Sequence, residues 1–81
     1  MGKMKYVVIE SLGILKPVIF DTLLEHKMFQ NYKVKSAGFV SFWIDEDGEM
    51  QVNVWGSSTT LDMISVPDDA DVIKKSLDRN Y

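Results

Sequence analysis

The chain of 81 residues contains no cysteine, one histidine and only two prolines. Without thiols it has no disulfide and no thiolate metal site, and a single histidine would leave zinc to depend mostly on carboxylates. No apolar run approaches the roughly 20 residues of a membrane-spanning helix. The N-terminus, MGKMKYVVIE, has no long apolar stretch before its first acid, unlike a signal peptide. We therefore expect a cytoplasmic protein with no metal, no cofactor and no membrane association.

Positive charge is also scarce, with 9 Lys+Arg against 12 Asp+Glu and a net charge of −3. Nonspecific nucleic-acid binding favours a basic surface, so this balance makes a nucleic-acid partner unlikely. A hydrophobic content of 46% is typical of a globular protein, and the length fits one domain over residues 1–81. Small domains without disulfides often gain stability by self-association, so a homodimer is a natural expectation.

The first half of the chain predicts two strands and a helix. Residues 4–10 contain a β-branched run that suits a central strand. Residues 14–20 extend again, but Pro17 cannot donate a ladder hydrogen bond, which indicates an edge strand. The segment 22-TLLE-25 has the pattern of a capping box, so we expect a helix from about Leu23 to Gln30. His26 falls opposite the apolar stripe of that helix and is expected to face water.

The stretch 41-SFWIDEDGEMQVNVW-55 predicts a hairpin whose register can be derived. A two-residue loop at Asp47-Gly48 would mix the faces and set Glu46 against Glu49. A three-residue loop ending in a left-handed Gly48 instead gives the apolar cross-strand pairs Ile44–Met50, Phe42–Val52 and Val40–Val54, with Phe39 opposite Trp55. This register leaves Asp45 facing Glu49, a mild like-charge cost.

The last third predicts one more strand and a second helix. A two-residue loop at Gly56-Ser57 would place a third strand, Ser58–Ile64, against the hairpin, with Leu61 opposite Val52 and Met63 opposite Met50. A loop at Ser57-Ser58 would keep the same faces. The segment 65-SVPDDADVIKKSLDRN-80 predicts a helix that begins near Pro67 or Asp68. Its inward stripe is expected to be Ala70, Ile73 and Leu77, and Asp68, Asp69 and Asp71 lie at its positive end.

The resulting order, β-β-α-β-β-β-α, predicts an α+β fold: a mainly antiparallel sheet with two helices packed on one face. The other face would then be open and would carry polar residues with aromatics among them. The candidate binding residues on this face are Phe39, Ser41, Trp43, Gln51, Asn53 and Trp55.

Three interpretations of this face remain open. The aromatics are core under a helix, the N-terminal segment or a loop; or they meet a protein partner or a second copy; or Phe39, Trp43 and Trp55 stack the bases of a single-stranded nucleic acid. We expect the neighbouring charges to be acidic, with Lys35 as the only nearby base, which disfavours the third. No small-molecule substrate is indicated.

Several apparent motifs are better explained structurally. The acidic turn 45-DEDG-48 lacks the remaining ligands of a calcium loop, and 56-GSSTT-60 lacks the Gly-Lys-Ser/Thr ending of a phosphate loop. His26 has no identifiable nucleophile to activate. With no catalytic residue to name, we expect a protein that is not an enzyme.

The chain as a whole is similar to small uncharacterised proteins of tailed bacteriophages and prophages. The resemblance lies in the order of five segments: YVVIE, PVIF, VKSAGFVSF, VWGSSTTL and a Pro-Asp-Asp-Ala segment before a short final helix. The resemblance implies a non-enzymatic accessory role and assigns no functional residue. We therefore expect an interaction module that binds a protein partner or itself through the aromatic face. The alternatives are single-stranded nucleic-acid binding and an acidic inhibitor that mimics nucleic acid to a host protein.

Overall fold

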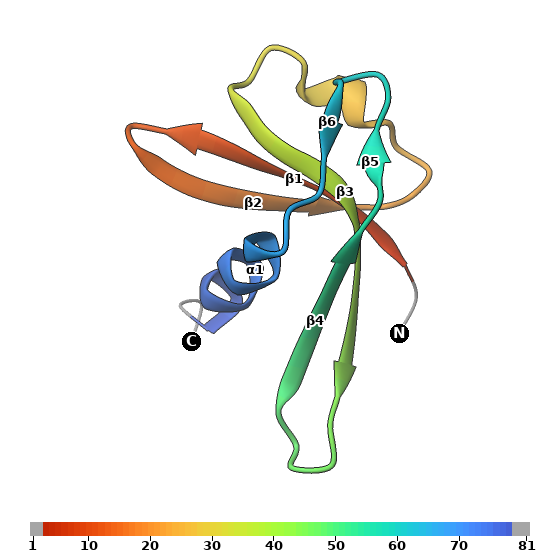
Figure 1. Cartoon of the computed structure of the whole chain (residues 1–81), viewed down its shortest axis with the longest axis vertical. Coiled ribbons are helices and arrows are strands. Elements are labelled where there is room, and N and C mark those ends of the chain that lie inside the picture. The colour runs from red at the N-terminus through yellow and green to blue at the C-terminus, as the bar shows by residue number, and fades with distance from the viewer. Residues whose placement is uncertain (1–2, 79–81) are drawn as a thin grey trace.

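The computed structural model describes residues 3–78 as an α+β fold with one four-stranded antiparallel sheet and one α-helix. Figure 1 shows how these elements are arranged. The elements are β1 (Met4–Ser11), β2 (Ile14–Phe20), the 3₁₀ turn η1 (His26–Phe29), β3 (Val34–Ile44), β4 (Met50–Trp55), β5 (Ser57–Ser58), β6 (Met63–Ile64) and α1 (Asp68–Asp78). The sheet has the order β2-β1-β3-β4, and β5 and β6 form a separate two-stranded ribbon. The predicted α+β class is confirmed.

The first two strands take the predicted positions. β1 lies inside the sheet between β2 and β3, and its residues Tyr6, Val7 and Val8 are buried. β2 is an edge strand, as Pro17 predicted. Proline has no N–H to donate to the ladder, so it is tolerated in edge strands, where one side needs no donor.

The final helix packs on one face of the sheet. Ile73 is buried against Tyr6, Val8 and Val40, and Leu77 packs at the margin of this cluster. The predicted start near Pro67 or Asp68 is confirmed by the observed start at Asp68. Residues 79–80 of the predicted helix lie outside the described residues.

The prediction of a first helix over Leu23–Gln30 on the same face is wrong. The segment forms only the four-residue turn η1, on the opposite face, where Phe29 packs beside a cluster that contains Val7 and Phe20. The Asp21 carboxylate accepts a hydrogen bond from the Leu23 N–H at 2.8 Å. This local turn competes with the first turn of a helix, and Leu23 is left 89% exposed.

The prediction for His26 is also wrong, because its side chain is only 6% exposed. Its Nε2 lies 2.9 Å from the Gly38 carbonyl oxygen, and its ring meets Phe20 edge-on. The sequence pattern could not show this, because it assumed a helix that does not form.

The predicted third strand beside β4 is wrong as well. After Gly56, at φ +79°, the chain leaves the sheet, and β5 and β6 pair with each other. Leu61 and Met63 pack on the second apolar cluster instead of lying opposite Val52 and Met50. The second cluster, unforeseen from the sequence, thus draws these side chains away and leaves β4 at the sheet edge.

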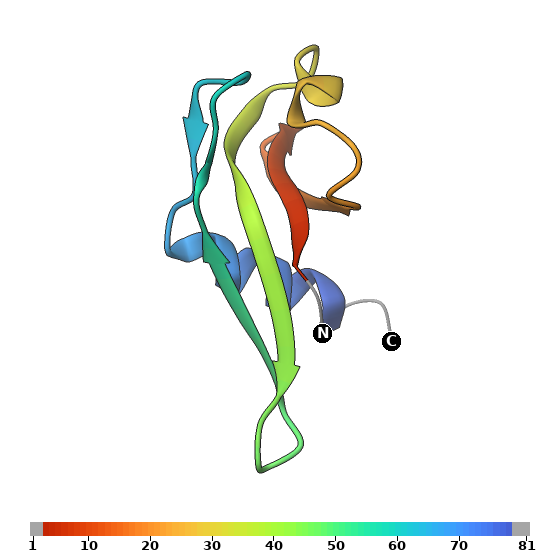
Figure 2. The same cartoon turned by 90° about the vertical axis from the view of Figure 1, so that its right-hand side faces the viewer.

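The hairpin of β3 and β4 projects beyond the body of the molecule, as Figure 1 shows, while Figure 2 shows α1 crossing behind the sheet. The tip extends past the helix, so Ile44 is 56% exposed although it belongs to the apolar face. The outer part of the hairpin is therefore exposed on both of its faces, at Trp43 on one and at Ile44 on the other.

Candidate functional site: the aromatic face of the hairpin

The predicted hairpin register is confirmed pair by pair. Phe39 lies opposite Trp55, Val40 opposite Val54, Phe42 opposite Val52 and Ile44 opposite Met50. Gly48 takes the left-handed conformation at φ +81°, and the Asp45 N–H donates to the Glu49 carbonyl oxygen at 2.9 Å. The register fixes which residues share each face of the two strands.

The Asp45 carboxylate, which this register sets opposite Glu49, has its own hydrogen-bond donors. It accepts hydrogen bonds from the Gln51 side-chain amide and from the backbone N–H groups of Asp47 and Glu49, at 2.8–2.9 Å. These bonds, the Gln51 amide first, hold the pKa of Asp45 below its ordinary value. Asp45 thus stabilises the turn, and the Gln51 side-chain amide already donates one hydrogen bond to it.

The six predicted binding residues lie on one face of β3 and β4, here called the aromatic face. α1 packs on the opposite face of the strands. On the aromatic face Trp43 is 47% exposed and Trp55 38% exposed, while Phe39 is half-buried. The tryptophans lie at opposite ends of the polar pair Ser41–Asn53, and the patch extends over roughly 13 Å of strand.

Phe39 is held at the base of this patch by aromatic and cationic neighbours. Its ring stacks on Trp55 with centroids 6.1 Å apart and an interplanar angle of 27°. His26 meets it edge-on at 6.0 Å, and the Lys3 ammonium lies 4.8 Å from its centroid. These contacts fix the Trp55 end of the face, whereas Trp43 stands at the free end of the hairpin.

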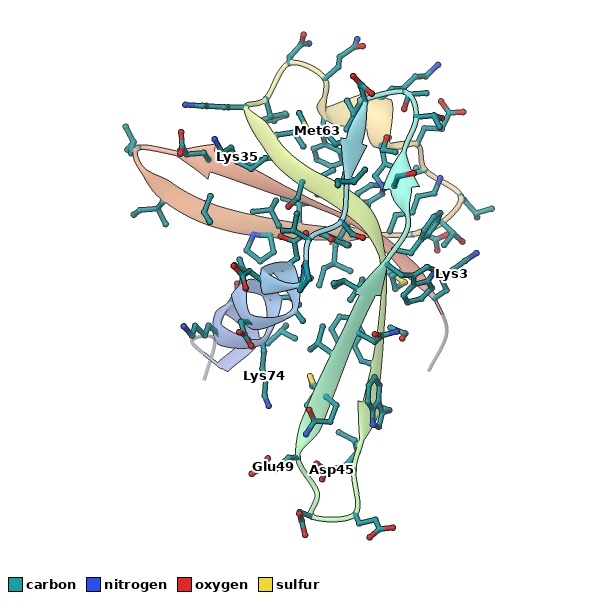
Figure 3. All side chains as sticks on the ribbon, in the orientation of Figure 1. Lys3, Lys35, Asp45, Glu49, Met63 and Lys74 are labelled. Carbon is teal, nitrogen blue, oxygen red and sulfur yellow. The ribbon has the colours of Figure 1, made fainter. Side chains whose placement is uncertain are left out.

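The charges around the face differ from the prediction. Figure 3 shows Lys3 beside the sheet near the start of the hairpin, Lys35 far up the molecule, and Asp45 and Glu49 at the hairpin tip. Lys5, the cross-strand neighbour of Phe39, donates from its ammonium group to the Leu24 carbonyl oxygen at 2.7 Å. The aromatic face therefore has Lys3 and Lys5 at its inner end, where Glu25 also lies, and acidic residues alone at its tip.

A shallow depression of about 260 Å³ adjoins the inner end of the face. Its lining consists of Lys5, Glu25, His26, Phe39 and the segment 57–60. No pattern in the sequence indicates that His26 and the 56-GSSTT-60 turn lie together, since their proximity depends on the β5–β6 ribbon. The Ser58 hydroxyl lies 3.3 Å from the Thr60 hydroxyl and no hydroxyl is paired with His26 among the described residues, so nothing here indicates an activated nucleophile.

A second polar group whose burial the sequence did not reveal is Asp69, which lies in the first turn of α1 and is buried against the sheet. Its carboxylate accepts hydrogen bonds from the Tyr6 hydroxyl, from the Ser36 hydroxyl at 2.8 Å and from the Val66 N–H at 3.1 Å. All its partners are structural, so it fastens α1 to the sheet and is not a candidate binding residue.

Comparison of the chain with protein-family models, with curated proteins and with solved structures gave no match. Among residues 3–78 no helix has the length and apolar character needed to span a membrane. Function must therefore be inferred from the geometry of the hairpin and its surroundings.

Proposed function

We propose that the chain is a non-enzymatic interaction module that binds a protein through the aromatic face. The observation that supports this is the pair of half-exposed tryptophans, Trp43 and Trp55, on a sheet face that α1 leaves uncovered. Tryptophan is the residue most enriched among energetic anchors at protein interfaces, because it offers a large rigid contact area. Ser41 and Asn53 between them supply polar groups for the same partner.

The charges specify the chemistry of the partner. The Lys3 ammonium lies over the Phe39 ring at the inner end, so it would attract acidic side chains on the partner. Lys5 and Glu25 lie near it and carry opposite charges. Acidic side chains at the tip would be repelled by Asp45 and Glu49. The expected partner is a protein surface with an apolar centre and acidic residues on the side that meets Lys3.

The test compares capture of bacterial proteins by the tagged chain with capture by Trp43→Ala and Trp55→Ala variants. A captured protein that meets the proposal loses at least about 30-fold in affinity with either variant, as truncation of a buried anchor costs about 2 kcal/mol or more. Tyr32→Ala is the matched control, because Tyr32 is a 57% exposed aromatic on another part of the surface. Variants that fold cooperatively and bind as well as the wild type would overturn the proposal, and so would variants that unfold, since the tryptophans would then be core.

A second candidate, single-stranded nucleic-acid binding, gains support from the ammonium group of Lys3 over the ring that stacks on Trp55. Titration of tryptophan fluorescence with oligonucleotides at low and high salt tests it. Salt-sensitive quenching supports base stacking, and the absence of quenching at low salt removes it. Nucleic-acid mimicry is less favoured, because burial of Asp69 removes one of the three clustered acids from the surface.

The biological setting belongs to the proposal as well. The sequence resemblance to small proteins of tailed bacteriophages and prophages supports an accessory role in the cytoplasm of a bacterial host. A partner would then be a bacterial or phage protein.

A further inference from the structure

The outer edge of β4 has no partner strand among residues 3–78, since β4 pairs only with β3. Backbone groups alternate along an antiparallel strand, so every second residue directs its N–H and C=O away from the neighbour. Asp45 hydrogen-bonds across the hairpin at its closed end. Counting from there, Gln51, Asn53 and Trp55 bond to β3, while Met50, Val52 and Val54 direct their N–H and C=O groups outward.

The two edges of the sheet are protected very differently. β2 carries Pro17, which lacks a donor, and the charged Lys16. β4 has the sequence MQVNVW, with no charge, no proline and no glycine. Natural proteins usually block a free edge with such residues, and an unblocked, uncharged edge is a template for another strand.

We propose that β4 pairs antiparallel with β4 of a second copy of the chain, about a two-fold axis at Val52. A closed dimer uses the same patch on both copies, and a two-fold axis normal to a sheet makes the joining strands antiparallel. With Val52 opposite the partner's Val52, Met50 lies opposite the partner's Val54. This register is the one that engages all three outward-facing residues of each strand.

The side chains on both faces fit this register. On the helix face, an open groove of about 370 Å³ lies beside β4, and five of its seven lining residues are apolar: it is lined by Val52, Asn53, Val54, Ser65, Val66, Pro67 and Ala70. The partner's Met50 would enter this groove, and methionine is an unbranched side chain that fills irregular apolar space. On the aromatic face, Gln51 would lie opposite the partner's Asn53.

The charges favour the same arrangement. Antiparallel pairing places the two acidic tips at opposite ends of the joined sheet, whereas parallel alignment would bring Asp45, Glu46, Asp47 and Glu49 of both copies together. It also sets Glu49 next to the partner's Trp55, one strand from Phe39 and the Lys3 ammonium that lies over it. Opposite charges thus come near each other at both ends of the pairing.

One consequence depends on the proposed function. A two-fold axis normal to the sheet turns both aromatic faces to the same side, so the dimer would present the four tryptophans as one surface. A partner with repeated binding segments would then bind with higher avidity than to a single chain.

The experiment measures mass by sedimentation equilibrium over a wide concentration range. The wild type is expected to move from 9.3 kDa toward twice that mass as concentration rises. Met50→Lys, which sets a charge in the apolar groove, should weaken dimerisation at least about 10-fold, and Met50→Leu should preserve it. A wild-type chain that stays monomeric up to about 1 mM overturns the proposal, because a dimer with a Kd at or below that concentration would be populated there.

The register is tested separately by cross-linking, which is clean because the chain has no cysteine of its own. Val52→Cys should form a disulfide-linked dimer under mild oxidation, since residue 52 meets itself across the axis within the Cα distance that a disulfide bridges. Ile14→Cys, on the other edge strand and 54% exposed, is the control and should not. Equal cross-linking at both sites would overturn the β4 pairing.

The Trp43→Ala variant distinguishes the proposed β4 dimer from the proposed binding of a protein through the aromatic face. Trp43 lies on β3, away from the pairing edge, so this variant should still dimerise while losing the captured protein partner. If the wild type is monomeric yet binds its partner through the tryptophans, only the dimer fails. If it dimerises and the tryptophan variants bind normally, only the proposed function fails.

Discussion

The Tyr6 hydroxyl donates a hydrogen bond to the Asp69 carboxylate, and this contact joins the central strand β1 to the helix α1. The same carboxylate accepts from Ser36 on β3 and from the backbone N–H of Val66 just before the helix. Asp69 therefore serves at once as a helix cap and as the polar link between three elements. The aromatic face depends on this link indirectly, because α1 covers the opposite face of the strands that present it.

Replacing Asp69 should be among the more damaging polar substitutions in the chain. Asp69→Ala removes the cap and leaves two buried hydroxyls without an acceptor, so we expect a loss of about 2–4 kcal/mol in the free energy of unfolding. Urea unfolding measures this. The control is Asp68→Ala. The Asp68 carboxyl is exposed in the first turn of the helix, so its removal should cost less than about 1 kcal/mol. Equal costs for the two variants would contradict the role assigned to Asp69.

Alkaline pH should destabilise the protein through Tyr6. Burial, then the hydrogen bond to Asp69 and the negative charge of that carboxylate, raise the pKa of the Tyr6 hydroxyl far above its ordinary value of 10.0. A group whose pKa is raised on folding contributes stability that is complete below its unfolded pKa and is lost as pH rises through the folded value. The midpoint of unfolding should therefore decrease as the pH rises above about 10. Tyr6→Phe should be less stable at pH 7 but should lose this part of the alkaline dependence.

Acidic pH should loosen the hairpin tip through Asp45. Its pKa is lowered by hydrogen bonds from the Gln51 amide and from the backbone of Glu49 and Asp47. Because the folded pKa is depressed, the stabilisation is present above the unfolded pKa near 4 and is lost as pH falls through the lower folded value. NMR titration should show the Glu49 amide shifting with the Asp45 carboxyl. Asp45→Asn should remove that transition, and Asp47→Asn should leave it in place.

The hairpin could be predicted from the sequence because local rules decide it. Cross-strand parity, a left-handed glycine and the even spacing of Phe42, Ile44, Val52 and Val54 all favour one register, and every predicted pair is observed. The edge position of β2 followed from Pro17 in the same way. Such features depend on residues a few positions apart and need no knowledge of the remaining fold.

The errors arose where distant segments decide the structure. The Thr22–Glu25 pattern resembles a helix start, but Asp21 makes its own turn and the following residues fill a second apolar cluster against Phe20 and Val7. Leu61 and Met63 have the parity of a strand beside β4, yet they pack on that same cluster. The second apolar cluster, which no periodicity in the sequence predicts, thus accounts for the short turn η1, the buried His26 and the open edge of β4.

Three glycines offer a graded test of the packing around the hairpin. A Cβ at Gly38 would lie 2.5 Å from the Trp55 carbonyl oxygen and 3.0 Å from the Ser65 Cβ. A Cβ at Gly56, at φ +79°, would lie 2.8 Å from the Phe39 ring, and one at Gly48, at φ +81°, would meet open space. Gly48→Ala measures the backbone strain alone, at about 1–2 kcal/mol.

Gly38→Ala should cost the most of the three, about 3 kcal/mol or more, because a backbone oxygen cannot move without breaking the pairing of β3 with β4. Gly56→Ala should fall between the other two and should also change tryptophan fluorescence, since the displaced Phe39 ring stacks on Trp55. Thermal unfolding gives the order, and the emission spectrum reports on the stack. If Gly38→Ala is no more harmful than Gly48→Ala, the β4 end of the sheet is looser than the structure shows. In that case neither the aromatic face nor the outer edge of β4 would be held rigidly enough for the roles proposed for them.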